Sequence, residues 1–98
     1  MINHQLKIKS EHLEAIISGV KTFVILKSDR EFKVGDRATL IEEEGNRYLT
    51  IRINYITSYA QQDGYVVFSF GWISGGKLLG EDKNGVLPMS FAELRDFN

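Results

Sequence analysis

The stretch LTIRINY, residues 49–55, alternates apolar and polar side chains without interruption. A period of two places successive side chains on opposite faces of an extended chain. The stretch therefore predicts a half-buried strand, and the rest of the fold depends on how its neighbours pack against it. Its apolar face carries Leu49, Ile51, Ile53 and Tyr55, and its polar face carries Thr50, Arg52 and Asn54.

Four neighbouring segments also have the composition of strands, namely residues 2–8, 22–27, 37–42 and 65–73. Residues 43–46 and 61–64 read as turns, because glycine and asparagine tolerate the positive φ of tight hairpin turns. The segment 22–27 does not alternate apolar with polar side chains, so both of its faces are expected to be covered. The predicted core contains Phe23, Ile25, Ile51, Ile53, Phe68 and Phe70.

Two short helices complete the pattern. The first is expected at about residues 11–18, with Ser10 as N-cap and Gly19 as the residue that ends it. The second follows Ser90, which forms a capping box with Glu93. Between the last strand and this helix, the glycines after Gly71 and the lone proline predict a loop or a loose hairpin. The apolar helix faces are Leu13, Ile16 and Ile17 in the first helix and Phe91, Leu94 and Phe97 in the second.

Composition limits the class of protein. The 98 residues suffice for one core, and hydrophobic residues make up 43% and charged residues 26%. Without cysteine, neither a disulfide framework nor a thiolate metal site is available. No segment has the length and hydropathy of a membrane span, so a cytoplasmic protein is expected. The net charge of −1 argues against bulk coating of nucleic acid, although the basic side chains are concentrated in the N-terminal half.

Three stretches carry a family resemblance. They are HQLKI at residues 4–8, GVKTF at 19–23 and DREFKVGD at 29–36. These resemble the H-x-L-K, G-x-K-T-F and D-R-x-F-x-V-G-D signatures of an uncharacterised bacterial and phage subfamily of ASCH domains. The resemblance implies an α+β fold, a small PUA-like β-barrel of about five to six mostly antiparallel strands with the two short helices. It covers about residues 1–70 of a single domain spanning 1–98, which leaves 71–98 as a C-terminal extension.

The resemblance also directs attention to Lys21, just past the end of the first helix and near the mouth of the implied barrel. ASCH relatives of this kind often carry a glutamate and an arginine on the next strand, where this chain has Val24 and Leu26. Some ASCH relatives are amidohydrolases that use a lysine and a threonine three residues later. Val24 stands in that threonine's place, and Thr22 comes two residues too early.

Other chemical motifs are incomplete. Residues 71–77 fit G-x-x-x-x-G-K, but Leu78 follows instead of the serine or threonine that would hold magnesium. His4 and His12 lack partners at metal-ligand spacing, so no metal and no cofactor is expected. The run of glutamates at 42–44 reads as a solvated turn.

The sequence therefore predicts a small binding module for RNA, a nucleotide or a modified base, in a cleft beside Lys21. Aromatic side chains available for base stacking are Tyr48, Tyr59 and Trp72. One alternative is a nucleoside or nucleobase amidohydrolase, which is less favoured because no acid/base set can be assembled. Another is a phage-type protein-interaction or inhibitor module that uses Val24, Leu26 and the segment 71–98. The candidate ligand-binding residues are Lys7, Lys21, Thr22, Lys27, Arg30 and Lys33.

Overall fold

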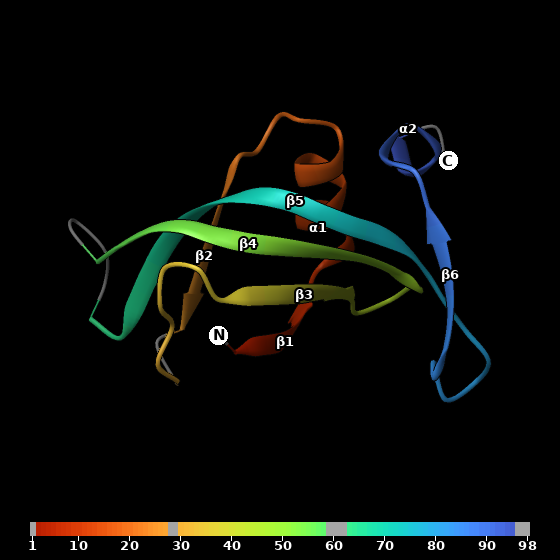
Figure 1. Cartoon of the computed structure of the whole chain (residues 1–98), viewed down its shortest axis with the longest axis horizontal. Helices are drawn as coiled ribbons and strands as arrows, with labels where there is room; N and C mark the ends of the chain where they lie inside the picture. The colour runs from red at the N-terminus through yellow and green to blue at the C-terminus, as the bar shows by residue number, and fades with distance from the viewer. Residues whose placement is uncertain (1, 28–29, 59–62, 96–98) are drawn as a thin grey trace.

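A curved sheet of six strands forms most of the molecule (Figure 1). The computed structural model describes residues 2–27, 30–58 and 63–95. Its elements are β1 (Asn3–Ile8), α1 (Ser10–Ile17), β2 (Phe23–Lys27), β3 (Arg37–Glu42), β4 (Arg47–Thr57), β5 (Tyr65–Leu79), β6 (Gly85–Met89) and α2 (Phe91–Arg95). The predicted α+β class, the number of strands and the two short helices are confirmed.

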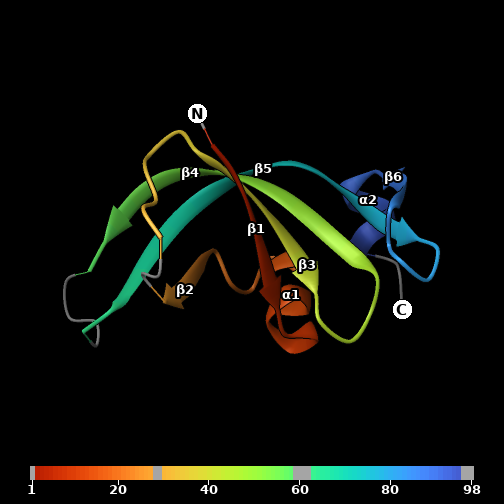
Figure 2. The same cartoon turned by 90° about the horizontal axis from the view of Figure 1, so that it is seen from below.

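The strand order is β1-β3-β4-β5-β2, and β6 pairs with the second half of β5. All ladders are antiparallel except that of β1 with β3, which is parallel. Among the described strands no ladder joins β1 to β2, so the sheet is open. It is nevertheless strongly curved, and Figure 2 shows β4 and β5 arching over α1. In the strand order β1 and β2 stand at the two ends.

The core lies between the concave face of the sheet and the two helices. Leu49, Ile51, Ile53 and Phe68 are fully buried, as are the predicted apolar positions of α1. Two predicted core residues are wrong, because Phe23 and Ile25 are 43% and 46% exposed. On β2 the alternate positions face inward instead, so Val24 is in the core and Leu26 packs against it. One face of this strand is therefore open to solvent.

Two local expectations also need correction. Lys9, not Ser10, is the N-cap of α1 and makes no side-chain capping bond. The Ser10 hydroxyl instead hydrogen-bonds to the carboxylate of Glu42. In the 43–46 turn, neither Gly45 nor Asn46 adopts a positive φ. Glycine is favoured at position 45 for another reason, because a Cβ there would displace the Glu42 carboxylate.

The expected loop after Gly71 is in fact the second half of β5. The strand continues to Leu79, and a turn at 80–84 leads into β6, so the hairpin alternative is the correct one. Helix α2 then docks on β5 through Trp72, whose ring meets Phe91 edge-on at 4.9 Å between centroids. The capping box is confirmed, since the Ser90 hydroxyl accepts from the Glu93 amide at 3.1 Å. Phe97 and residues 61–62 lie outside the described residues.

Candidate functional site: a basic groove between β1 and β2

A groove of about 980 Å³ lies between β1 and β2, the two strands at the ends of the sheet. Five successive residues from β1 and its end, 5–9, line it on one side, and residues 24–27 of β2 line it on the other. Successive residues point to opposite faces of a strand, so a groove that touches all of them runs along the strand edges. The groove therefore occupies the gap between β1 and β2.

The floor of the groove is apolar. Leu6 and Ile8 from β1 meet Val24 and Leu26 from β2 at this gap, and all four also belong to or pack on the core. Val24 is 3% exposed, so it is part of the protein interior as well as the floor. A charged side chain at this position would be buried without a partner, which costs several kcal/mol. An apolar floor of this kind suits a flat, weakly polar group such as a base.

The rim of the groove is basic. Its lining includes five lysine or arginine side chains and one carboxylate, that of Glu43. Lys21 lies 3.4 Å from His12, with the ammonium donating to Nδ1 of the imidazole. The same ammonium sits 5.4 Å from the centre of the Phe23 ring. The basic lining residues are Lys7, Lys9, Lys21, Lys27 and Arg30.

Backbone groups of β1 also face this groove. The carbonyls of Ile2 and Ile8 accept hydrogen bonds from the β3 side, from the amides of Arg37 and Glu43. The odd-numbered residues of β1 therefore direct their N–H and C=O groups away from β3. Gln5 fits this pattern, because its carbonyl accepts from the Arg30 guanidinium at 3.5 Å. The edge of β1 thus offers hydrogen-bond donors and acceptors beside the basic rim.

A family model described as Domain of unknown function (DUF3850) matches residues 3–70, more than two-thirds of the chain. The chain belongs to this family. Every residue that lines the groove lies between positions 5 and 65, inside the part of the chain that matches DUF3850. No curated protein matches the chain. Residues 71–79 of β5 lie beyond the match, as do β6 and α2, although β5 runs through residue 70 without a break.

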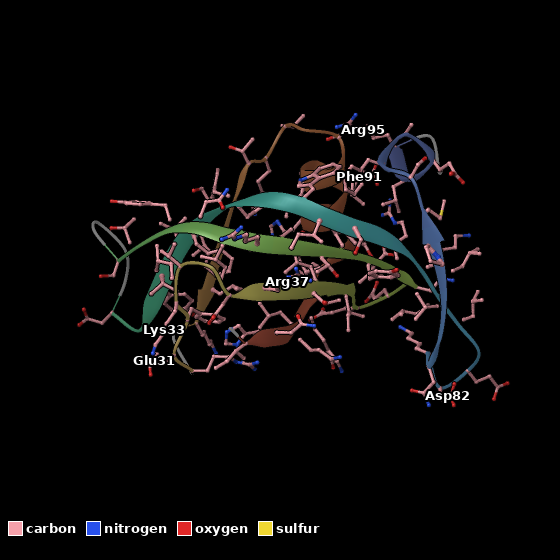
Figure 3. The ribbon with its side chains drawn as sticks, viewed as in Figure 1. Glu31, Lys33, Arg37, Asp82, Phe91 and Arg95 are labelled. Carbon is pink, nitrogen blue, oxygen red and sulfur yellow. The ribbon has the colours of Figure 1, made fainter. Side chains whose placement is uncertain are left out.

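Four of the six predicted ligand-binding residues meet in the DUF3850 groove. Lys7, Lys21, Lys27 and Arg30 line it, whereas Thr22 is exposed and does not. Lys33 also lies elsewhere, 3.5 Å from the carboxylate of Glu31, and Figure 3 shows these two side chains together at one end of the molecule. Sequence reasoning missed Lys9, His12 and Gln5. For Gln5 and Lys9 the signal was parity, because the exposed positions of β1 are the odd ones. His12 lies on α1, and its contact with Lys21 depends on tertiary packing.

The aromatic side chains offered for stacking are not at this groove. Tyr48 is buried and Trp72 is covered by α2, with Phe91 against its ring and the Arg95 guanidinium 5.2 Å from its centre. Tyr59 lies outside the described residues. The aromatic side chain that does line the groove is Tyr65, at the start of β5.

A buried ion-pair network holds α1 beside the groove. The Arg47 guanidinium donates to Glu42 at 2.9 Å and to Glu14 of α1 at 2.6 Å. Burial acts most strongly on Glu42 and raises its pKa, but hydrogen bonds from Arg47 and Ser10 outweigh it and lower that pKa below its ordinary value. The expectation that Glu42 is solvated is therefore wrong. By joining α1 to the β3–β4 hairpin, the network fixes the helix from whose end Lys21 emerges.

A second buried pair fixes the start of β1. The His4 ring contacts the Asp36 carboxylate at 2.9 Å, and that carboxylate also accepts from the amides of Ile2 and Lys33. The bond from His4 is the main reason that the pKa of Asp36 is lowered. His4 and Asp36 are the first and last residues of the three family-like stretches, so these motifs meet in the structure as scaffold.

Metal and phosphate-loop chemistry find no support in the described part of the chain. No group of three or more histidine or carboxylate side chains gathers there as a metal site. Residues 71–77, which fit the G-x-x-x-x-G-K pattern, lie within strand β5 and lead into no helix. None of the described helices is long and apolar enough to cross a membrane.

Proposed function

We propose that this chain is a PUA-like binding module of the ASCH type that holds single-stranded RNA, a nucleotide or a modified base in the groove between β1 and β2. The observation that supports it most strongly is the composition of the groove: five cations around an apolar floor, with one carboxylate. Phosphate oxygens fit the lysine and arginine side chains of the rim. A base fits the apolar floor and can bond to the free edge of β1.

The proposal also accounts for the curvature of the sheet. In this view β1 and β2 approach each other as the last two strands of a PUA-like barrel, and the ligand occupies the seam between them. Peptide groups at an open sheet edge attract other strands unless something protects them. The flanking lysines on both sides of this edge serve that purpose and also bind anions. A cytoplasmic location is consistent with a nucleotide ligand and belongs to the proposal.

The two alternative functions fit the structure less well. For an amidohydrolase, the position of the required threonine is occupied by Val24 in the core, and Thr22 lies off the groove. For a protein-interaction module, the predicted contact face of Val24 and Leu26 is turned inward. Substitution of Val24 by glutamate, which ASCH relatives often carry at this position, is expected to destabilise the fold because the site is buried. Binding without chemistry remains the function that this groove supports best.

The experiment is fluorescence anisotropy with a labelled single-stranded RNA at low salt. Lys21→Ala and Lys27→Ala are expected to weaken binding at least threefold each, because each removes a cation from the rim. Lys33→Ala removes the same charge from a site outside the groove and should leave binding unchanged. Equal losses in all three variants would mean that net charge, not the groove, determines binding, and would contradict the proposal.

A further inference from the structure

The convex face of the sheet, turned away from α1, is basic although the whole chain is slightly acidic. The six described strands contain one carboxylate and six lysine or arginine residues, and of these six only Arg47 is buried. That carboxylate is Glu42, which is buried and bonded to Arg47 and Ser10. Acidic side chains are thus kept to the helices, turns and loops. On an exposed sheet face this distribution favours contact with an anion.

Two arginines stand directly opposite each other on this face. Arg37 of β3 and Arg52 of β4 are partners in the antiparallel register, and both are exposed. Like charges at directly opposed positions destabilise a sheet. No carboxylate of the described residues bonds to either guanidinium. Figure 3 shows Arg37 over the middle of the sheet, between the ribbons of β3 and β4.

A β-bulge next to this pair turns an aromatic ring to solvent. Leu49, Ile51 and Ile53 point into the core, and simple alternation would send Tyr55 there as well. The register of β4 shifts between Ile53 and Tyr55, so Tyr55 pairs with Ser69 and is 62% exposed. Bulges re-aim side chains at functional sites more often than chance would allow. The same shift explains why the sequence pattern misplaced this residue.

A second exposed ring continues the surface toward the groove. Phe23 of β2 pairs with Ser69 from the other side, so Ser69 lies between Phe23 and Tyr55 in one row across the sheet. Two residues further along β5, Gly71 is opposite Arg52. These small residues leave both rings uncovered. Lys21 contacts the Phe23 ring and also lines the groove, so the two surfaces are continuous.

We propose that this convex face, defined by Phe23, Tyr55, Arg52 and Arg37, binds the continuation of a nucleic-acid strand that leaves the groove. The inference rests on the proposed function and identifies its ligand as a single strand several nucleotides long. The rings stack two bases, and the paired arginines contact phosphates. From β2 to β3 the face spans three strand spacings, or about 14 Å. A mononucleotide in the groove cannot reach the arginine pair.

The test compares a single-stranded RNA of roughly 12 nucleotides with a mononucleotide, CMP, used as unlabelled competitor. Tyr55→Ala should weaken binding of the RNA about fivefold or more, through the lost stacking. The inhibition constant of CMP should be unchanged. Tyr55→Phe keeps the ring and should bind as the wild type does. The double variant Arg37→Gln/Arg52→Gln should reduce the slope of log K against log salt by about 1.4, because two single-strand phosphate contacts are lost. Val86→Ala changes an exposed residue of β6 and serves as the control.

The outcomes separate this inference from the function on which it rests. If Lys21→Ala weakens binding of both ligands while Tyr55→Ala and the double arginine variant bind the RNA normally, the convex-face inference is wrong and the groove proposal stands. If the wild type binds neither the RNA nor CMP at low salt, the proposed function itself is wrong. Thermal melts of each variant, monitored by circular dichroism, exclude unfolding as the cause of any loss.

Discussion

Removal of the cation from the buried Glu42–Arg47 pair is expected to destabilise the protein severely. The two side chains are 8% and 9% exposed, and their nearest charged atoms are 2.9 Å apart. In Arg47→Met the aliphatic stem is replaced by one of similar size, but Glu42 keeps a buried charge without its main partner. Breaking such a pair costs about 3–5 kcal/mol, against a total of about 5–15 kcal/mol for a domain of this size.

The assay is urea denaturation followed by circular dichroism at about pH 7 and about pH 4. In the wild type the pKa of Glu42 is lowered, so its contribution is present above the ordinary pKa of 4.5 and is lost as pH falls through the folded value. In Arg47→Met burial is no longer opposed by the cation, so the pKa of Glu42 rises. Protonation of Glu42 in acid then removes the unpaired buried charge of the variant. The stability difference between the two proteins should therefore narrow in acid.

Two further variants make the reasoning refutable. Arg52→Met removes an exposed arginine from the same strand and is expected to cause no loss. Glu42→Gln combined with Arg47→Met replaces the stranded charge by a neutral acceptor and should recover part of the stability. A loss of less than about 1 kcal/mol in Arg47→Met at neutral pH, or a difference that widened in acid, would show that the pair does not anchor α1 as described.

Four other substitutions test separate parts of the structure. Phe68→Ala should lower the free energy of unfolding by about 3–5 kcal/mol in urea titrations. Phe23→Ala should lower it by no more than about 1.5 kcal/mol, because that ring is exposed. Equal losses would contradict the assignment of the core. Gly45→Ala should lower the melting temperature, since the new Cβ displaces the Glu42 carboxylate, and an unchanged melting temperature would be the contrary result. Arg52→Thr should raise the free energy of unfolding by about 0.2–1 kcal/mol, with the gain shrinking at high salt; a loss would remove the argument from like-charge strain.

Much of the sheet was predictable because its central strands have one buried face. Strict alternation over residues 49–55 identified β4, and it placed Ile51 and Ile53 in the core correctly. Alternation fails for Tyr55, because a bulge inserts one residue and reverses the parity. It fails for β2 in another way: every side chain from Phe23 to Leu26 is apolar, so composition gives no sign of which face is exposed.

Glycines in the second half of β5 allowed two predictions, a loop or a loose hairpin, and the hairpin is the one that the structure has. Gly75 and Gly76 lie within the strand. Both positions are glycine because neighbouring atoms come too close for a side chain. A Cβ on Gly75 would overlap Leu94 of α2, and one on Gly76 would overlap the Leu87 carbonyl of β6. Glycine in a strand often marks such a close approach. The sequence alone cannot distinguish this use from a turn, because the contacting elements are distant along the chain.

The candidate site was predicted in part. The basic residues expected beside Lys21 include Lys7, Lys27 and Arg30, and all of them line the same groove as Lys21. The Arg47 network was missed, although its signal was present: Glu42 has the parity of Ala38 and Leu40 in β3, and a carboxylate at an inward position needs a cation. The bonding of that cation to Glu14 depends on tertiary packing.

The most direct test of the central claim is a nuclear magnetic resonance titration of the full chain with a short single-stranded RNA. If the groove between β1 and β2 is the binding site, the largest amide shifts should fall on Lys7, Lys21 and Lys27, along both strand edges. The turn at 80–84 contributes no residue to the lining of this groove and should not respond. Shifts confined to that turn, or no saturable shifts at low salt, would contradict the account.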